Sequence, residues 1–521
     1  MDRFAAAIAL HRGSGSDLEV FLVHRSPDLR FFGDYLAMPG GVRSPMDGPD
    51  DGESEDAGTA VGVGRADARA MRQCATRELF EETGVLLDAG MRSLPARRRA
   101  ELRRGLLARD EAVAEEAWRE LHSASAGPPE LVDLCRIRTP AFTPVRYDTQ
   151  FFLAELPHGE EPDVWPGELT TGRFETAESW LREWAAGDCL IVPPVVALLQ
   201  RLRAGNLSSF AADAAAMTAG FQRGKLHRVF FSPGILTTIL NTPTLPPATT
   251  TNCAIVGTDR LFIVDPGAPE AVDQALLFEL LDELRHEGAS LEAVISTHHH
   301  RDHVGAVNAV SQRYQLPVHA HGITMERLEP GFLRGRVLAD GDRIDLGTAP
   351  DGSPDWYLEA IFTPGHDRGH LAFRESRYKA LIAGDMISTV ATIIIDPPEG
   401  HLQTYMNSLY RLLATEMTTL LPAHGPAVPD GKKIVETFIT HRELRQRTLR
   451  AAVAEGPNTV AGLLPNVYRD VSEAMYPYAA RVLLAGLEQL AEAGEVADSD
   501  GVWTATTTMA QRVSGDPCDS A

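Results

Sequence analysis

Apolar residues in the first part of the chain follow the spacings of both strands and helices. Short apolar runs at 4–10 and 19–23, separated by a Gly/Ser turn, predict a β-hairpin. The stretch 69–83 has a helical pattern and ends at Gly84, a residue typical of helix ends. Strands mixed with helices predict an α/β domain, which we place at residues 1–205.

One stretch interrupts this pattern. Residues 44–64 hold six acidic residues and five glycines but no Lys or Arg, and their apolar positions show no period. Such a composition favours a flexible acidic loop inserted into the first domain.

Residues 95–122 have a helical pattern and carry a basic cluster. A basic cluster can bind phosphates, but acidic residues of the same stretch can pair with it, which favours a salt-bridged, solvated helix face. The basic residues are Arg97, Arg98, Arg99, Arg103 and Arg104.

The remaining chain predicts two further domains. After a connector at 206–227, apolar strands alternate with helices, which predicts an α/β domain at 228–440. Helices followed by a short strand pair predict a small domain at 441–508, and 509–521 is expected to be a disordered tail. The fold class is therefore multi-domain α/β, and 521 residues at about 150 per domain also suggest about three domains.

Composition limits the partners. The net charge of −23 argues against generic DNA binding, and the third domain, with 7 basic and 11 acidic residues from position 441 onward, fits a lid or a dimerisation role better. Five cysteines without a C-x-x-C pair favour a reducing compartment. No apolar run approaches the roughly 18 residues of a membrane span, so we expect a cytoplasmic protein without a membrane partner.

Three carboxylates of the helix at 69–83 form a candidate metal site. Glu78, Glu81 and Glu82 stand at i, i+3 and i+4 and therefore share one helix face. Oxygen ligands of this kind suit Mg²⁺ or Mn²⁺, which also bind substrate phosphates. A solvated acidic helix face is the alternative.

The surrounding residues favour the metal site. R-E-L-F-E-E-T-G-V at 77–85, preceded by P-G-G at 39–41, resembles the Nudix box, G-x(5)-E-x(7)-R-E-U-x-E-E-x-G-U with U aliphatic. Gly41 and Arg77 are 36 positions apart against 14 in the usual box, and the 22 extra positions correspond closely to the acidic loop. Counted back from Arg77, the upstream Glu of the box falls at Arg69, so that carboxylate is expected to be missing.

The resemblance implies a fold and an activity. Residues 22–41 and 146–153 resemble the CoA-diphosphatase subgroup of Nudix hydrolases, which have an α/β/α sandwich. It implies metal-assisted hydrolysis of a diphosphate linkage in a nucleotide or CoA-type substrate. Glu78, Glu81 and Glu82 would hold Mg²⁺ or Mn²⁺, with Glu78 and Glu82 catalytic, and Arg25 and Arg30 would contact a substrate phosphate. A non-catalytic ligand sensor, with ordinary surface arginines, is the alternative.

A second candidate metal site begins at S-T-H-H-H-R-D-H-V-G, residues 296–305, directly after an apolar strand. The end of a strand is where α/β sheets present their sites, and imidazole and carboxylate ligands suit zinc. A surface histidine run, as in an expression tag, would lack the strand and the Asp. Three later segments supply His366, Asp385 and His424, the last two directly after apolar strands.

This set resembles the metallo-beta-lactamase signature, H-x-H-x-D-H followed by H, D and H, which implies an αββα sandwich with two zinc ions. One zinc would be held by His298, His300 and His366, the other by Asp302, His303 and His424, with Asp385 bridging. The resemblance implies attack by a metal-bound hydroxide, and Asp302 would be catalytic as a proton acceptor if one metal binds. His370 is expected to orient a loop beside the site.

Residues 402–409 and 441–445 resemble a lactamase-beta-like branch that carries a C-terminal winged helix. Relatives of that branch include single-strand endoribonucleases and acyl-thioester hydrolases. We therefore expect a two-site hydrolase of small molecules, among them acyl-CoA or nucleotide diphosphates. An endoribonuclease that binds single-stranded RNA is the alternative.

Overall fold

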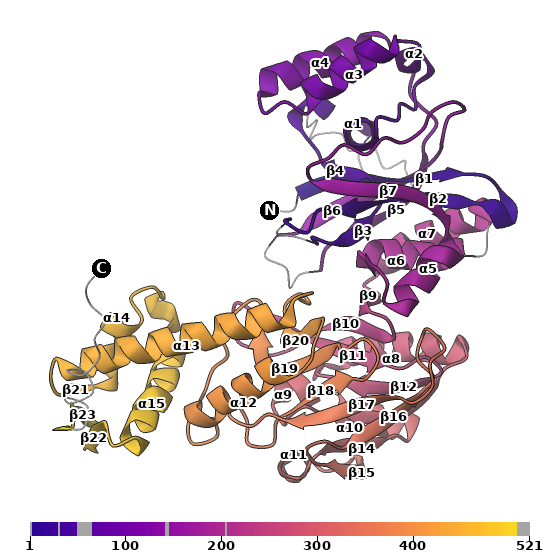
Figure 1. The fold of residues 1–521 in the computed structure, drawn as a ribbon. Helices are drawn as coiled ribbons and strands as arrows, with labels where there is room; N and C mark the ends of the chain where they lie inside the picture. The colour runs from indigo at the N-terminus through magenta and orange to yellow at the C-terminus, as the bar shows by residue number, and fades with distance from the viewer. Residues whose placement is uncertain (1–2, 30–31, 49–64, 141–144, 204–205, 508–521) are drawn as a thin grey trace. The chain divides into compact units, whose positions relative to one another are not determined.

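A computed structural model describes the chain apart from residues 1–2, 30–31, 49–64, 141–144, 204–205 and 508–521. The chain divides into two compact units, Met1–Pro233 and Gly234–Ala521 (Figure 1). Both contain sheets covered by helices, so the multi-domain α/β architecture expected from the apolar pattern is confirmed. None of the described helices combines the length and the apolar character that a bilayer span requires.

The first unit is built around one mixed sheet. The strands of this sheet are β1 (Arg3–Arg12), β2 (Glu19–Arg25), β3 (Tyr35–Ala37), β4 (Gly40–Val42), β5 (Val132–Arg138), β6 (Tyr147–Glu155), β7 (Leu169–Thr176) and β8 (Leu190–Ile191). The unit also contains β9 (Val229–Ser232), which is not a strand of this sheet. Its helices are α1 (Arg65–Thr83), α2 (Ala89–Arg92), α3 (Ala96–Leu106), α4 (Glu111–Ser123), α5 (Ala177–Ala186), α6 (Pro193–Leu202) and α7 (Leu207–Gln222). The strand order is β5-β6-β1-β2-β3-β8, with β4 paired to β1 and β7 paired to β2.

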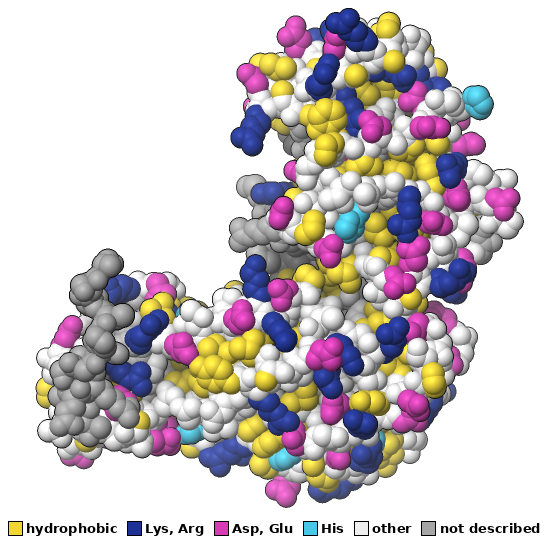
Figure 2. Space-filling model, in the orientation of Figure 1, with side chains coloured by type: hydrophobic (Ala, Val, Ile, Leu, Met, Phe, Trp, Pro, Cys, Tyr) yellow, Lys and Arg dark blue, Asp and Glu magenta, His cyan; other side chains and the backbone are white. Residues whose placement is uncertain are grey.

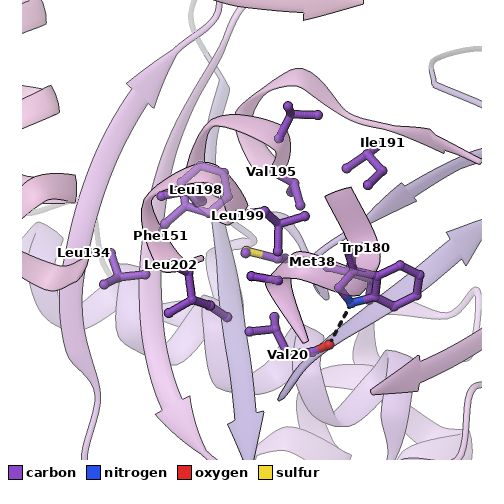
Figure 3. Packing of buried hydrophobic residues seen from close by; sticks show 14 of the residues in the cluster. Val20, Met38, Leu134, Phe151, Trp180, Ile191, Val195, Leu198, Leu199 and Leu202 are labelled. Carbon is purple, nitrogen blue, oxygen red and sulfur yellow. Dashed lines mark hydrogen bonds between the residues drawn. The ribbon is translucent and has the colours of Figure 1, made fainter. Parts of the chain in front are cut away.

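Strand β1 shows how this sheet is covered on both faces. Successive side chains of a strand point to opposite faces. Ile8 packs in a core with α1, whereas Ala9 packs in a second core with α5, α6 and α7. Figure 3 shows the second core, where the ring nitrogen of Trp180 on α5 donates a hydrogen bond to the carbonyl of Val20 at 3.0 Å. The first unit is therefore an α/β/α sandwich.

The segment 206–227, which the sequence suggested as a connector, contains helix α7. Phe210 and Ala214 on this helix are fully buried in the second core. The hydroxyl of Thr218 accepts a hydrogen bond from the backbone of Arg136 on β5 at 2.9 Å. Most of the segment is thus part of the first unit.

The first residues of the expected acidic loop, 44–48, have a defined structure. A 3-10 helix, η2 (Pro45–Asp47), has a capping box at its N-terminus, in which Ser44 and Asp47 exchange side-chain and backbone hydrogen bonds. Asp47 is fully buried because it pairs with Arg77. Residues 49–64, the rest of that loop, lie outside the described residues.

The second unit contains two sheets. Its strands are β10 (Ile235–Asn241), β11 (Thr250–Val256), β12 (Arg260–Val264), β13 (Ser290–Ile295), β14 (Pro317–His321), β15 (Leu333–Leu338), β16 (Arg343–Gly347), β17 (Trp356–Phe362), β18 (Leu371–Glu375), β19 (Leu381–Ser388) and β20 (Leu420–His424). The accompanying helices are α8 (Ala271–His286), α9 (Arg301–Val304), α10 (Val307–Tyr314), α11 (Gly322–Arg327) and α12 (Leu402–Ala414). One sheet includes the order β15-β14-β13-β12-β11-β10 and the other has the order β16-β17-β18-β19-β20.

These two sheets form the centre of a four-layer sandwich. Strand β11 contacts β20 across the sheets, helix α10 packs on β13, and helix α12 packs on the core of the other sheet. In the first sheet β12 and β13 run parallel, so Val264 lies beside Ile295 and the loops that follow them start side by side. In the second sheet β19 and β20 are also parallel. The αββα layers expected for this part of the chain are confirmed.

The chain ends in a small helical domain. It contains α13 (Gly431–Ala454), α14 (Val460–Val467), α15 (Tyr476–Glu492) and the strands β21 (Asn458–Thr459), β22 (Val496–Ser499) and β23 (Val502–Ala505). Its core includes Leu463, Leu487 and Trp503. Helix α13 runs without interruption through positions 440 and 441, so the expected boundary falls inside one helix that packs on α12 and also on α14.

Candidate functional site

Seven of the residues singled out in the second half of the sequence come together in the second unit. They come from the segment after β13, which includes the short helix α9, from the loop after β17, from strand β19 and from the end of β20. The seven are His298, His300, Asp302, His303, His366, Asp385 and His424. Their donor atoms form two groups, and within each group the atoms lie no more than 4.8 Å apart.

The first group is formed by three histidines and Asp385. The Nδ1 atom of His300 lies 3.0 Å from Nε2 of His298 and 3.0 Å from Nε2 of His366. The second group is formed by Asp302, His303 and His424. Here Oδ2 of Asp302 lies 3.5 Å from Nε2 of His424 and 3.9 Å from Nε2 of His303.

Asp385 lies between the two groups and offers one oxygen to each. Its Oδ1 is 3.2 Å from Nε2 of His424 and 3.4 Å from Nε2 of His303. Its Oδ2 is 3.4 Å from Nε2 of His366 and 4.0 Å from Nε2 of His298. This is the geometry of a carboxylate that can bridge two cations.

The buried donor atoms fit a divalent metal. Nε2 of His303 and Oδ1 of Asp385 are buried without a hydrogen-bond partner. A buried polar atom without a partner costs about 1–3 kcal/mol, and a bound cation would remove that cost for both atoms. Nitrogen and oxygen donors in this mixture suit zinc and related divalent ions.

In three of these histidines Nε2 faces the other donor atoms of the site, and a backbone or side-chain acceptor contacts Nδ1. Nδ1 of His303 lies 2.9 Å from a carboxylate oxygen of Asp265, Nδ1 of His366 lies 2.8 Å from the carbonyl of Ile394, and Nδ1 of His424 lies 2.9 Å from the carbonyl of Thr250. An acceptor at Nδ1 keeps the proton there and leaves Nε2 unprotonated, as a metal ligand requires.

The charges of the site also favour a bound cation. Burial lowers the pKa of His303, but the carboxylates of Asp385, Asp302 and Asp265 outweigh burial and raise it well above the ordinary value. Burial raises the pKa of Asp385, but His424 and His303 outweigh it and hold that pKa well below the ordinary value. The site thus contains negative charge that attracts a cation, whether a proton or a metal ion.

Asp265, in the loop after β12, is a member of the site that the sequence analysis missed. Its carboxylate accepts hydrogen bonds from the backbone and hydroxyl of Thr297, at 2.8 and 2.6 Å, and contacts His303. The V-D-P-G sequence after an apolar strand was the signal, because it puts a carboxylate beside the end of β13.

His370 and His299 support the site from outside. His370 is fully buried, and its Nε2 accepts a hydrogen bond from the backbone of Asp385 at 3.1 Å while its Nδ1 lies 2.8 Å from the Thr363 hydroxyl. His299 points to Asp367, with 2.5 Å between Nδ1 and Oδ2. Asp367 neighbours His366, so His299 helps to hold that loop.

The candidate site of the first unit lies on α1, and Arg77 is its centre. This buried guanidinium contacts Asp47 at 2.7 Å, Glu78 at 2.9 Å and Glu81 at 3.0 Å. Gly41 allows the close packing of Glu78, since a Cβ at position 41 would lie 2.4 Å from the Glu78 carboxyl. In this arrangement the arginine supplies the positive charge between these carboxylates.

Glu82 lies on the same helix face, and one of its oxygens accepts a hydrogen bond from the backbone of Gly40 at 2.9 Å. Burial, and then the neighbouring Glu78, raise the pKa of Glu82 well above its ordinary value. Burial also raises the pKa of Glu78 to about 7, although Arg77 opposes the shift. Glu81 shows the same direction for the same reasons. Crowded, buried carboxylates of this kind favour a cation.

The three glutamates do not form a ready cage. Over the described residues, the groups of donor atoms within 4.8 Å of one another all lie in the second unit. Of the two expected phosphate contacts, Arg25 donates a hydrogen bond from Nε to the carbonyl of Phe32 at 3.2 Å. Arg30 lies outside the described residues.

Asp47 corrects the expectation that an upstream carboxylate is missing. That expectation counted back from Arg77 and reached Arg69. Counted forward, Asp47 stands six positions after Gly41, which is the G-x(5)-E spacing with Asp in place of Glu. The extra positions therefore follow Asp47 instead of preceding it, and the carboxylate reaches Arg77 in the structure.

Most arginines of the basic cluster on α3, and several arginines of α13, are paired within the protein. On α3, Arg98 contacts Glu101 and Glu120, and Arg99 contacts Glu160. On α13, Arg445 contacts Asp470 and Arg450 contacts Glu495, and the buried Arg442 donates to a backbone carbonyl. Figure 2 shows basic and acidic side chains interspersed over the visible face, without an extended basic surface.

Comparisons with known proteins find two families that match segments of the second unit. Residues 246–424 match the metallo-beta-lactamase superfamily, and residues 459–503 match the beta-lactamase associated winged helix domain. A hydroxyacylglutathione hydrolase of Ruegeria pomeroyi is 30% identical over 203 residues, which are 38% of this chain and 75% of the relative. A beta-lactamase-like protein 2 homolog of Caenorhabditis elegans is 27% identical over 227 residues, 42% of this chain and 71% of the relative.

A solved structure is similar to another part of the chain. The NUDIX hydrolase of Alicyclobacillus acidocaldarius is 28% identical, with 41% of this chain and 96% of that chain covered and a TM-score of 0.34.

Proposed function

The chain is a metal-dependent hydrolase that belongs to the metallo-beta-lactamase superfamily, and we propose that its second unit cleaves an ester or thioester at a site for two zinc ions. The observation that carries the proposal is Asp385, whose two oxygens face the two separate groups of donor atoms. His298, His300 and His366 would hold one ion, and Asp302, His303 and His424 the other, with Asp385 shared between them.

Bound zinc would supply an activated water and a Lewis acid for the carbonyl oxygen of the substrate. The protein's own residues would hold these elements in place. Asp265 and the carbonyls of Ile394 and Thr250 fix the imidazole orientations through Nδ1. Asp302 is half-buried and belongs to the second group, and it could accept a proton from the attacking water if only one metal binds.

An acyl thioester is the substrate class that we favour. One relative is named for the hydrolysis of a hydroxyacyl group carried by glutathione, and acyl-CoA is a related thiol conjugate. A panel of acyl-glutathione, acyl-CoA and simple ester substrates, with Zn²⁺ supplied, tests the proposal. We expect turnover that His300→Ala and Asp385→Asn reduce at least 100-fold, while the exposed control His286→Ala retains it. Full activity of the zinc-free protein would exclude the proposal. Turnover that survives both substitutions would exclude it as well.

We also propose that the first unit is a diphosphatase similar to Nudix hydrolases, with Mg²⁺ or Mn²⁺ bound by Glu78, Glu81 and Glu82. Support comes from the burial of these carboxylates, from their raised pKa values and from the G-x(5)-D spacing that brings Asp47 to Arg77. Because Arg77 now pairs with Glu78 and Glu81, a metal ion would have to compete with its guanidinium.

A panel of nucleoside-diphosphate and CoA-type substrates with Mg²⁺ tests this second activity. We expect turnover that is lost in Glu82→Gln and kept in Glu115→Gln, an exposed glutamate of α4. Binding of such a ligand without any turnover would favour a non-catalytic sensor instead.

Cleavage of single-stranded RNA is less well supported, because the arginines Arg442, Arg445 and Arg450 of α13 all have acceptors within the protein. RNA cleavage that disappears in His300→Ala would reverse this preference. The four described cysteines are free, which supports the proposal of a reducing compartment such as the cytoplasm.

A further inference from the structure

One segment joins the metal site to the C-terminal helices. Residues 393–401 connect the site to the start of α12. The carbonyl of Ile394 holds Nδ1 of His366 at 2.8 Å, and the backbone of His401 donates a hydrogen bond to the carbonyl of Gly365 at 2.8 Å. His366 and its loop are therefore oriented by two backbone contacts with this segment.

Two arginines of the C-terminal helices hold the same segment from the other side. Arg442 on α13 is buried and donates a hydrogen bond from Nη2 to the carbonyl of Ile393. Arg481 on α15 pairs with the carboxylate of Asp396, and its Nη2 donates to the carbonyl of Pro397 at 3.2 Å. The carbonyl that orients His366 thus lies between two anchored points of the backbone.

The far end of the segment is held in a similar way. Nε2 of His401 lies 3.0 Å from both carboxylate oxygens of Glu492 on α15. The side chain of Gln489, on the same helix, donates to Gln403 at 2.6 Å. Helix α15 thus contacts the segment and the first turn of α12 at several positions.

We propose that Arg442 and Arg481 are positioning residues for His366, so that the C-terminal domain sets the metal affinity of the group formed by His298, His300 and His366. This inference rests on the proposed metal site of the second unit. Residues that orient a metal ligand through its second nitrogen change metal affinity or activity about 10–100-fold when removed. The arginines act one step further away, so we expect about a tenfold effect from each.

This role differs from nucleic-acid binding, which an arginine-rich helix beside a winged helix would otherwise suggest. The guanidinium groups of Arg442 and Arg481 are used on backbone carbonyls and on Asp396. Planar guanidinium groups suit this task because each can donate several hydrogen bonds in fixed directions.

The test uses the full chain and measures metal binding directly. Competition with a chromophoric chelator gives the two zinc dissociation constants, and Co²⁺ absorption reports the geometry of each site. In Arg481→Ala we expect the constant for one ion to rise about tenfold while the other changes little, with partial recovery in Arg481→Lys. Arg447→Ala, an exposed arginine on α13, is the matched control and should behave as wild type.

Arg442→Lys provides a second variant in case Arg442→Ala fails to fold, since lysine keeps the charge and one donor at a buried position. Wild-type protein that binds no zinc would refute the proposed function itself. Wild-type protein that binds two ions, together with Arg481→Ala and Arg442→Lys variants of unchanged affinity and Co²⁺ spectrum, would refute only the positioning role.

Discussion

The substitution Asp265→Asn changes one atom in the network around the metal site. In the wild type, one carboxylate oxygen of Asp265 accepts from the backbone of Thr297 at 2.8 Å. The other oxygen lies 2.6 Å from the Thr297 hydroxyl and 2.9 Å from Nδ1 of His303. An amide keeps the shape of the carboxylate but offers only one acceptor oxygen and replaces the other with a donor.

The magnitude follows from the group that loses its acceptor. If the amide nitrogen faces His303, the imidazole must accept at Nδ1, so its proton moves to Nε2 and blocks the atom that faces Asp385. Loss of such a partner costs about 10–100-fold in metal affinity, or about 1.4–2.7 kcal/mol. If the nitrogen faces the Thr297 backbone instead, two buried donors oppose each other at a cost of about 1–3 kcal/mol of stability.

The two outcomes are separated by two assays. Chelator competition measures the affinity of the second group for zinc, and urea unfolding of the metal-free protein measures stability. Asp259→Asn is the control, because Asp259 is exposed and lies just before β12, the strand that leads to Asp265. Metal affinity and metal-free stability both equal to wild type in Asp265→Asn would refute the reasoning that this carboxylate orients His303.

Three further predictions concern packing and pH. A Cβ at Gly267 would lie 1.9 Å from the Asp302 carbonyl, so Gly267→Ala should displace the ligand loop and lower zinc binding at least tenfold by chelator competition. Trp180→Phe removes the hydrogen bond to the carbonyl of Val20 and should lower the unfolding free energy in urea by about 1–3 kcal/mol. Burial lowers the pKa of His227 to about 4, below the ordinary 6.5, so the unfolded chain binds this proton more tightly. The contribution of neutral His227 should be complete above pH 6.5 and lost toward pH 4, and His227→Gln should flatten that part of the stability profile.

Each of these three predictions has a result that would contradict it. Gly322→Ala, where a Cβ would meet its nearest neighbour at 3.5 Å, should bind zinc like wild type, and equal loss in both glycine variants would point to general instability. An unchanged unfolding free energy in Trp180→Phe would mean that the Val20 carbonyl finds another donor. A wild-type stability profile in His227→Gln between pH 4 and 6.5 would show that another group titrates there.

The sequence was most informative where the chemistry is local. The strand that precedes His298, and the spacing of His300, Asp302 and His303, are encoded within 14 positions, 290–303, and the structure brings them together with the later residues. Asp265 could not be found in this way, because it reaches His303 only through the parallel pairing of β12 with β13. Asp265 and His303 are far apart in the sequence, so their direct contact cannot be read from local spacing.

Helix periodicity also has a limit that α13 illustrates. Arg442, Arg445, Arg447 and Arg450 recur along this helix, a pattern compatible with a solvated face, since a period shows which residues share a face but not what that face contacts. In the structure Arg442 is buried against the carbonyl of Ile393, and Arg445 and Arg450 pair within the C-terminal domain. The same continuous helix conceals the boundary expected at position 441.

The first unit shows how two residues can stay paired across a long insertion. Asp47 and Arg77 are 30 positions apart, against 8 in the usual box, yet the structure pairs them through two hydrogen bonds of 2.7 and 2.9 Å. Closure entropy grows only with the logarithm of the number of residues between two contacting positions, so an increase from 8 to 30 costs only about 1.2 kcal/mol. Hydrogen bonds between charged groups contribute about 1.5–3 kcal/mol each, enough to offset that cost. The buried ion pair therefore joins the two segments that resemble the box, residues 41–47 and 77–82.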